Sequence, residues 1–140
     1  MKLTIVYDNE VKEQKLEADW GFSCFIEEEN IPSILFDTGA DGSILLHNMK
    51  ELNIDPGTIG IIVISHSHWD HAGGLNDILV LNKDAEIYIP SSFRTAMPGR
   101  KVIRVEDATQ ICHNVFSTGE LRGIEQSLAI ATDKGILAVL

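Results

Sequence analysis

Four residues that can bind a metal ion follow directly on an apolar segment. The segment, residues 60–64, is typical of a buried strand, and His66, His68, Asp70 and His71 come after it in the spacing His-x-His-x-Asp-His. In extended backbone alternate side chains point the same way, so His66 and His68 can hold one ion. Asp70 and His71 follow at a turn and can reach a second ion or a water between two ions. Imidazole nitrogens with one carboxylate suit zinc best, with iron or manganese as alternatives.

This set of residues indicates hydrolytic chemistry. Divalent ions in such a site lower the pKa of a water toward about 7, so that it can attack an ester, an amide or a phosphoester. Asp70 is expected to orient that water and to accept a proton during the reaction. Trp69, which lies between the ligands in sequence, is expected to pack under the loop rather than to stack on a substrate.

Three other residues are weaker candidates. Asp37 ends a strand predicted over residues 31–36 and either accepts a ring N–H from a ligand histidine, fixing its tautomer, or caps the turn. His113 follows Cys112 in an apolar segment and is either an extra ligand or a structural residue. His47 lies off the apolar stripe of a predicted helix and is expected at the surface.

The predicted elements position the histidine loop between a sheet and helices. A helix is predicted at residues 41–53 and another at 75–81. Strands are predicted at residues 2–8, 21–27, 31–36, 60–64, 85–89, 101–105, 111–116, 127–132 and 136–140. A helix between two strands makes a crossover, so we expect a mixed sheet covered by helices.

The histidine loop and its surroundings resemble the metallo-β-lactamase superfamily. The likeness includes residues 1–20, the turn at 35–40 and the segment 116–120, and it is greatest to the branch that contains the dihydropterin-ribofuranosylaminobenzene-phosphate synthases. The resemblance implies an α/β (α+β) fold that is about half of a four-layer αβ/βα sandwich, with a mixed β-sheet carrying helices on one face. It therefore implies that residues 1–140 are a single truncated domain, the amino-terminal portion of such a protein.

The resemblance also implies an activity and leaves two alternatives open. In the superfamily, later segments supply a further histidine, a bridging carboxylate and a last histidine. This chain is then a metal-dependent hydrolase with two zinc ions in its complete site, or a transferase like the synthases, with missing ligands contributed by a partner. The alternative is a catalytically silent, shortened relative that only binds metal or self-associates.

Composition limits the class and partners of the protein. The chain has 44% hydrophobic and 23% charged residues and a formal charge of −10, which is typical of a soluble globular protein and argues against nucleic acid as a partner. We expect no membrane association, a cytoplasmic location, two unpaired cysteines and a small-molecule substrate that could be phosphorylated. Four basic residues either touch that substrate or lie in a solvated loop: Arg94, Arg100, Lys101 and Arg104. A homo-oligomer or a complementing second half is the expected protein partner.

Overall fold

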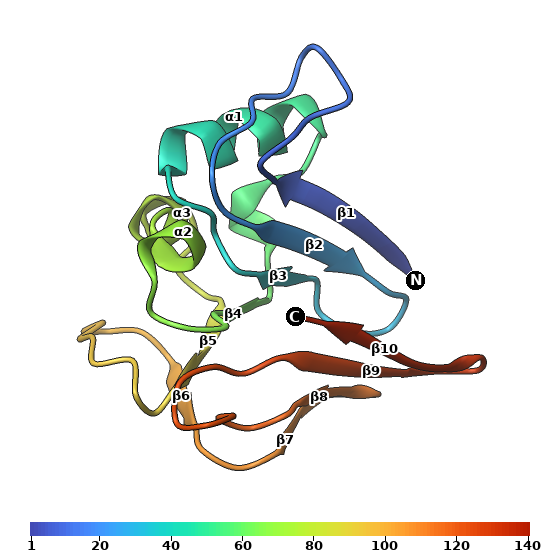
Figure 1. Cartoon of the computed structure of the whole chain (residues 1–140), viewed down its shortest axis with the longest axis vertical. Helices are drawn as coiled ribbons and strands as arrows, with labels where there is room; N and C mark the ends of the chain where they lie inside the picture. Colours follow the sequence, from blue (N-terminus) through green and yellow to red (C-terminus); the bar gives the residue numbers. More distant parts are fainter.

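The computed structural model describes all residues from 1 to 140 and places them in three layers (Figure 1). The strands are β1 (Lys2–Tyr7), β2 (Ser23–Glu27), β3 (Ile34–Phe36), β4 (Ile61–Val63), β5 (Glu86–Pro90), β6 (Val102–Val105), β7 (Thr109–Cys112), β8 (Val115–Ser117), β9 (Leu128–Thr132) and β10 (Gly135–Val139). The helices are α1 (Gly42–Glu51), the 3-10 turn η1 (Pro56–Thr58), α2 (Trp69–Ala72) and α3 (Leu75–Leu81). None of these helices is both long and apolar enough to span a bilayer.

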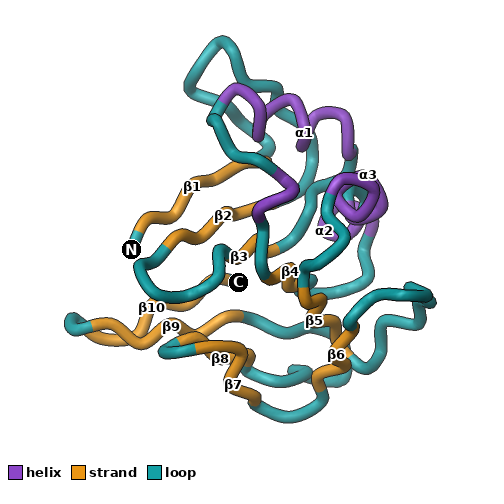
Figure 2. Tube along the Cα trace, turned by 180° about the vertical axis from the view of Figure 1, so that it is seen from behind, coloured by secondary structure: helices purple, strands orange, loops and turns teal.

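The strands form two sheets. A six-stranded sheet has the order β1-β2-β3-β4-β5-β6, and a four-stranded antiparallel sheet has the order β10-β9-β8-β7. In the larger sheet β1, β2 and β3 pair antiparallel, and β3 to β6 pair parallel. Helices α1 and α3 cover one face of this sheet and the smaller sheet covers the other (Figure 2). The prediction of a mixed sheet with helices on one face is therefore confirmed.

Strand β4 lies at the centre of both cores. Ile62 and the following Ile64 pack into the core under the helices, and Ile61 and Val63 pack into the core between the sheets. All four side chains are buried, because a parallel strand covered on both faces must be apolar along its whole length. The chain that leaves β4 thus starts from a rigid support.

Helix α1 begins where the sequence predicts it. Asp41 is the N-cap, and its side chain accepts hydrogen bonds from the backbone N–H groups of Ser43 and Ile44. Leu45 and Met49 are completely buried against the sheet. Helix α3 coincides with its predicted range, so both helices are confirmed.

One predicted strand is wrong. Residues 111–116 were expected to form a single strand, but they belong to the hairpin of β7 and β8, which turns at His113 and Asn114. Asn114 has a φ of 61°, a left-handed conformation that asparagine adopts at low cost. Ile111 and Val115 both face the core between the sheets, so an apolar segment with one turn residue imitates a continuous strand. The short helix α2 was not predicted.

Both cysteines are free thiols, as expected, and Cys24 yields a testable prediction. Cys24 is 1% exposed, and its burial raises the pKa of the thiol to about 11. Such a thiol is about a thousandth ionised at pH 8, against about a quarter for an ordinary cysteine, and the thiolate is the reactive form. The half-buried Cys112 also has a pKa raised by burial, but it is more accessible than Cys24. In a titration with Ellman's reagent at pH 8, we expect one thiol, Cys112, to react in the native protein and two fast thiols in denaturant. Two fast thiols in the native protein would contradict the buried position of Cys24.

Candidate metal centre

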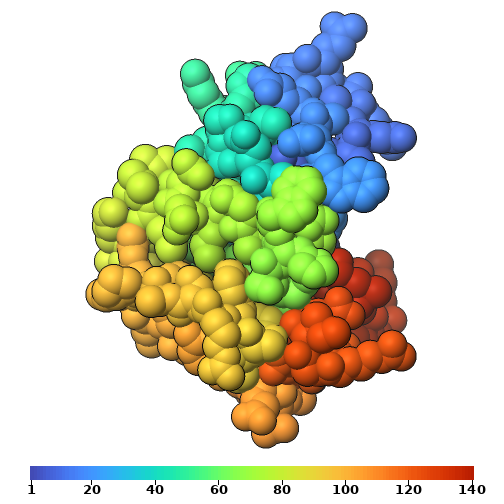
Figure 3. Space-filling view, turned by 60° about the vertical axis from the view of Figure 1, so that its left-hand side comes forward, coloured from blue at the N-terminus to red at the C-terminus, as the bar shows by residue number.

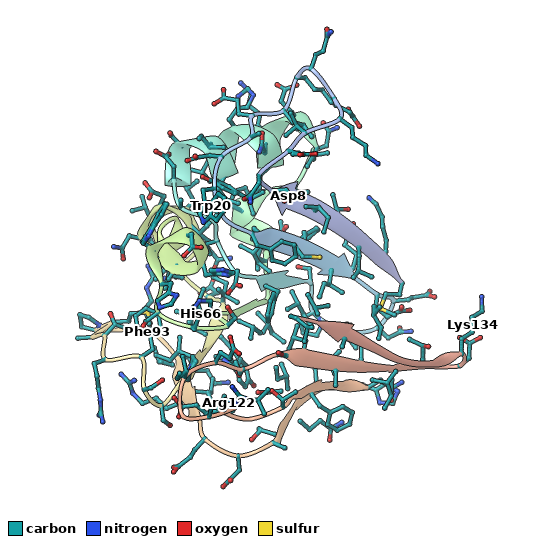
Figure 4. All side chains as sticks on the ribbon, viewed as in Figure 1. Asp8, Trp20, His66, Phe93, Arg122 and Lys134 are labelled. Carbon is teal, nitrogen blue, oxygen red and sulfur yellow. The ribbon has the colours of Figure 1, made fainter.

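The histidine loop leaves the carboxyl end of β4, beside the end of its parallel neighbour β3. The loop runs from Ser65 to His68, which precedes the first residue of α2. Figure 3 shows the residues that follow, in green, bordering the orange-red segment near residue 120 on one face of the molecule. In Figure 4, His66 lies where the helical layer meets the ends of the strands. The carboxyl ends of parallel strands are a common position for binding sites in open α/β sheets.

The imidazole rings of the loop are close together. His66 Nε2 lies 3.0 Å from His68 Nδ1, and the two ring centroids are 4.5 Å apart. The His66 and His71 centroids are 4.3 Å apart. Two nitrogen ligands of one tetrahedral zinc are expected about 3.3 Å apart, given zinc–nitrogen bonds of about 2.0–2.1 Å. The nitrogens of His66 and His68 therefore fit one zinc ion.

Asp37 orients the loop from beneath. Its side chain is completely buried, and its Oδ1 accepts a hydrogen bond from the backbone N–H of Ser65 at 2.6 Å. Its Oδ2 accepts from Ser65 Oγ at 2.7 Å and lies 2.7 Å from His71 Nδ1. A carboxylate can only accept, so Nδ1 of His71 carries the proton and Nε2 keeps a free lone pair.

The same reasoning applies to His66. The Ser65 hydroxyl donates its single hydrogen to Asp37, so its oxygen accepts from His66 Nδ1, 2.8 Å away. Nε2 of His66 then carries no proton, and it accepts from His68 Nδ1, 3.0 Å away. Burial, the largest effect, lowers the pKa of His66, which favours the neutral imidazole that a metal requires. The hydrogen bond to Asp37 raises the pKa of His71.

Asp70 and His71 form a second pair of donors. Asp70 Oδ2 lies 3.6 Å from His71 Nε2, the nitrogen that Asp37 leaves free. The structure thus holds two pairs, His66 with His68 and Asp70 with His71. No group of three or more histidine, cysteine, aspartate or glutamate side chains converges on one position. A catalytic zinc usually has three protein ligands, so each pair is one ligand short.

Two other candidates lie apart from these pairs. His113 lies in the β7–β8 turn and lines a cavity of about 550 Å³ together with Glu28 and Asn30 of the β2–β3 turn. That turn precedes β3, whereas Asp37 follows it, so the structure does not bring His113 to the histidine loop. His47 Nε2 lies 2.9 Å from the carbonyl oxygen of Lys15, in the connection between β1 and β2.

Trp69 does not pack under the loop, and that expectation is wrong. Its side chain belongs to the first residue of α2 and is 64% exposed. The space beneath α2 is closed by backbone: Gly73 N–H donates to Gly39 O at 2.9 Å, and a Cβ at Gly73 would lie 2.1 Å from Ala40 O. Main chains this close leave no room for an indole ring.

Sequence reasoning missed three residues near the loop. Ser65 connects Asp37 to His66, as described above. Gln126 donates its backbone N–H to Ser65 O at 2.9 Å. Glu125, its neighbour, is exposed, and its charge raises the pKa of both His66 and His71, although other effects are larger. The serine was visible beside the histidines, but nothing in the sequence connects residues 125 and 126 to a loop 60 residues earlier.

The fold is a mixed sheet with helices on one face and a second sheet on the other, with a cluster of histidines at the ends of the parallel strands. It is an α/β fold of a recognisable class. The family model described as the metallo-beta-lactamase superfamily matches residues 23–125. The chain belongs to this superfamily.

Two curated relatives come from Methanocaldococcus jannaschii. The chain is 42% identical over 81 residues to the 7,8-dihydropterin-6-methyl-4-(beta-D-ribofuranosyl)-aminobenzene-5'-phosphate synthase, an alignment covering 54% of this chain and 28% of the relative. It is 31% identical over 140 residues to the uncharacterized protein MJ0448, covering 94% of this chain and 50% of the relative. The chain thus spans half or less of the curated relatives it matches.

Solved structures share the fold at low identity. A quorum-quenching N-acyl homoserine lactone lactonase superposes with a TM-score of 0.67 at 20% identity, over 84% of this chain and 58% of the other. The metallo-beta-lactamase MIM-2 superposes with a TM-score of 0.65 at 20% identity, over 84% of this chain and 53% of the other. These similarities establish the metallo-beta-lactamase fold.

Proposed function

We propose that this chain carries the zinc-binding loop of a metal-dependent hydrolase. His66 and His68 would hold one zinc ion, and Asp70 and His71 a second. The observation that carries the proposal is the orientation of the rings: Asp37 and Ser65 bind the Nδ1 atoms of His71 and His66, which leaves both Nε2 atoms without a proton. Ligand histidines in metal sites are oriented by hydrogen bonds of this kind.

The residues of the loop take separate roles in this proposal. A bound divalent ion supplies Lewis acidity and lowers the pKa of a water toward about 7. Asp70, half-buried beside His71, is placed to orient the attacking water and to accept its proton. Asp37 holds the His71 ring and, because it is completely buried, does not meet the substrate.

The missing ligands would come from a partner, either a second copy or a complementing polypeptide. Strand β10 supports this part of the proposal. It is an edge strand, so one side of its backbone is unpaired, and Ile136 in it is 78% exposed. An exposed apolar edge strand is a surface that favours pairing with another chain.

The substrate in this proposal is a small molecule, and a phosphorylated one would be bound mainly by the metal ions. Three of the four basic residues for which substrate contact and a solvated loop were the alternatives have partners within the protein. Arg100 donates to the carbonyl oxygens of Asn82 and Leu79, and Arg104 donates to Phe93 O. The third, Lys101, forms an ion pair with Glu86. These contacts direct the three side chains to residues 79–93, none of which belongs to the histidine loop.

A synthase-like transferase is the second candidate, favoured by the 42% identity to the dihydropterin synthase. The third possibility is a silent relative that binds metal weakly or not at all. A silent relative would differ from both enzymes in metal content and mass in solution. Two tightly bound ions per chain, or per closed dimer, are expected for the enzymes, and a metal-free monomer for the silent relative.

The test of hydrolase activity uses protein stripped with a chelator and then reconstituted with zinc. We expect hydrolysis of an aryl phosphodiester, an aryl ester or a lactone only in the reconstituted protein. Asp70→Asn removes the proton acceptor and should lower the rate about 100-fold or more. Asp77→Asn, in α3, is the matched control and should behave as the wild type. Equal rates with and without zinc, or in Asp70→Asn, would contradict the proposal.

A further inference from the structure

Gln126 is a buried carboxamide that joins the two sheets at the histidine loop. It is 1% exposed, and its Nε2 donates to Ile64 O at 3.0 Å and to Tyr88 O at 3.3 Å. Its Oε1 accepts from Ser117 Oγ at 2.6 Å, and its backbone N–H donates to Ser65 O at 2.9 Å. Both the amide nitrogen and the amide oxygen of the side chain are therefore hydrogen-bonded. Gln126 lies between β8 and β9 of the smaller sheet, so its bonds to Ile64 and Tyr88 connect the two sheets.

The carboxamide replaces strand pairing where β4 and β5 end. The last backbone bond between these strands runs from Ile64 N–H to Tyr88 O at 2.9 Å. Beyond it the chain turns toward the histidines, and Gln126 takes the place of a strand neighbour by binding both carbonyl groups. Without Gln126, Tyr88 O would keep its bond from Ile64 N–H, but the buried Ile64 O would lose this donor, which is unfavourable.

Ser65 is therefore held on two sides. The peptide group between Ile64 and Ser65 donates its N–H to Asp37, and its carbonyl oxygen accepts from the Gln126 carboxamide, which Gln126→Met removes. The carbonyl oxygen of Ser65 accepts from the backbone N–H of Gln126, which the substitution leaves in place. The hydroxyl of Ser65 accepts from the His66 ring. The orientation of the His66 ring thus depends on Gln126, which lies 60 positions later in the chain, between two strands of the smaller sheet.

We propose that Gln126 is a positioning residue of the metal centre, which fixes Ser65 and, through Ser65, the ring of His66. The expected effect of Gln126 on metal affinity rests on the proposed function, whereas its expected effect on the orientation of the His66 ring does not. Without the carboxamide, the start of the loop can rotate. His66 Nε2 and His68 Nδ1 then no longer stay 3.0 Å apart.

The chain offers a matched control at the opposite end of β4. Asn82 is also 1% exposed, and its Nδ2 donates to Pro56 O at 2.8 Å and to Ile59 O at 2.7 Å. Its Oδ1 accepts from the backbone N–H of Ala85 at 2.9 Å. Removing this carboxamide should destabilise the protein by a similar amount without reaching the histidines.

The experiment compares Gln126→Met with Asn82→Leu, both of which replace an amide by an apolar group of similar size. In zinc-free protein, long-range proton–nitrogen NMR of the imidazole rings should show His66 in a single Nδ1–H tautomer in the wild type and in Asn82→Leu. In Gln126→Met, we expect shifts averaged between the tautomers. Titration with Co²⁺, followed by visible absorbance, should show affinity about 10-fold or more lower in Gln126→Met and within about 3-fold of wild type in Asn82→Leu.

The outcomes separate this inference from the proposed function. A wild-type His66 spectrum in Gln126→Met, or equal changes in both variants, would overturn the positioning role. If wild-type protein binds no Co²⁺ but Gln126→Met still loses the His66 tautomer, the proposed function fails and the positioning of the ring stands. Should Gln126→Met not fold, Gln126→Asn, shorter by one methylene, is expected to cause a smaller loss of the same tautomer. A wild-type spectrum in that folded variant would also overturn the inference.

Discussion

Replacement of His66 by alanine is expected to weaken Zn²⁺ or Co²⁺ binding by about 100-fold or more. Residues that only support a metal ligand already change affinity by about 10- to 100-fold, and His66 provides one of the two nitrogens 3.0 Å apart. The measurement is a competition titration against a chromophoric chelator at constant pH. The folded state of the variant is checked by its thermal unfolding, because a half-buried surface ring should contribute little to stability.

Two other histidines provide the controls for this variant. His113→Ala changes a residue of the β7–β8 turn, and His47→Ala changes one that contacts Lys15 O. Neither should change the metal affinity by more than about 3-fold. A His113→Ala variant that loses metal as strongly as His66→Ala would place the ligand set elsewhere. Wild-type affinity in His66→Ala would remove the basis of the proposed function.

The closeness of the side chains within each proposed pair was predictable because the two residues of a pair are near each other in sequence. His66 and His68 are separated only by Ser67, so their rings were expected to lie close together, and His66 Nε2 is 3.0 Å from His68 Nδ1. The chain bends at Ser67, so this closeness does not come from the extended backbone that the sequence argument assumed. The order of strands and helices is also predictable from local sequence. Strand β4 has four consecutive buried apolar residues, counting Ile64, and α1 has a capping aspartate and an apolar stripe.

The long-range contacts are less predictable. Asp37 reaches His71 across 34 positions, and the sequence indicated this contact only as one of two alternatives. Gln126 reaches Ile64 across 62 positions, and no local pattern distinguishes it from an ordinary polar residue before a strand. The hairpin of β7 and β8 was missed because Ile111 and Val115 face one core from two different strands. Pairing between distant segments is decided by packing, which a local pattern does not contain.

Both long-range contacts converge on Ser65. Asp37 binds its N–H and hydroxyl from the β3 side, and Gln126 binds its carbonyl oxygen from the side of the smaller sheet. The histidine loop is exposed, yet its first residue is 4% exposed and joined to both layers of β-structure. The start of the histidine loop is therefore fixed against both sheets, and this limits the positions that the His66 ring can take.

Asp37→Asn is expected to lower both stability and metal affinity. Asp37 has a φ of 59°, which asparagine tolerates as aspartate does, so the backbone can stay unchanged. The amide can still accept from Ser65 N–H, but its NH₂ group then faces the Ser65 hydroxyl and His71 Nδ1, which both need an acceptor. Unsatisfied buried donors should cost about 1–3 kcal/mol, measured by chemical denaturation.

The effect on metal binding follows from the tautomer of His71. With an amide N–H opposite Nδ1, the ring is favoured with its proton on Nε2, the nitrogen that faces Asp70. A metal must then displace that proton, so we expect affinity about 10- to 100-fold lower than in the wild type. Asp41→Asn is the control, since it removes an exposed carboxylate of the α1 cap and does not contact the histidines. If Asp37→Asn lost stability but kept wild-type affinity, Asp37 would support the turn alone, and the orientation of His71 would need another cause.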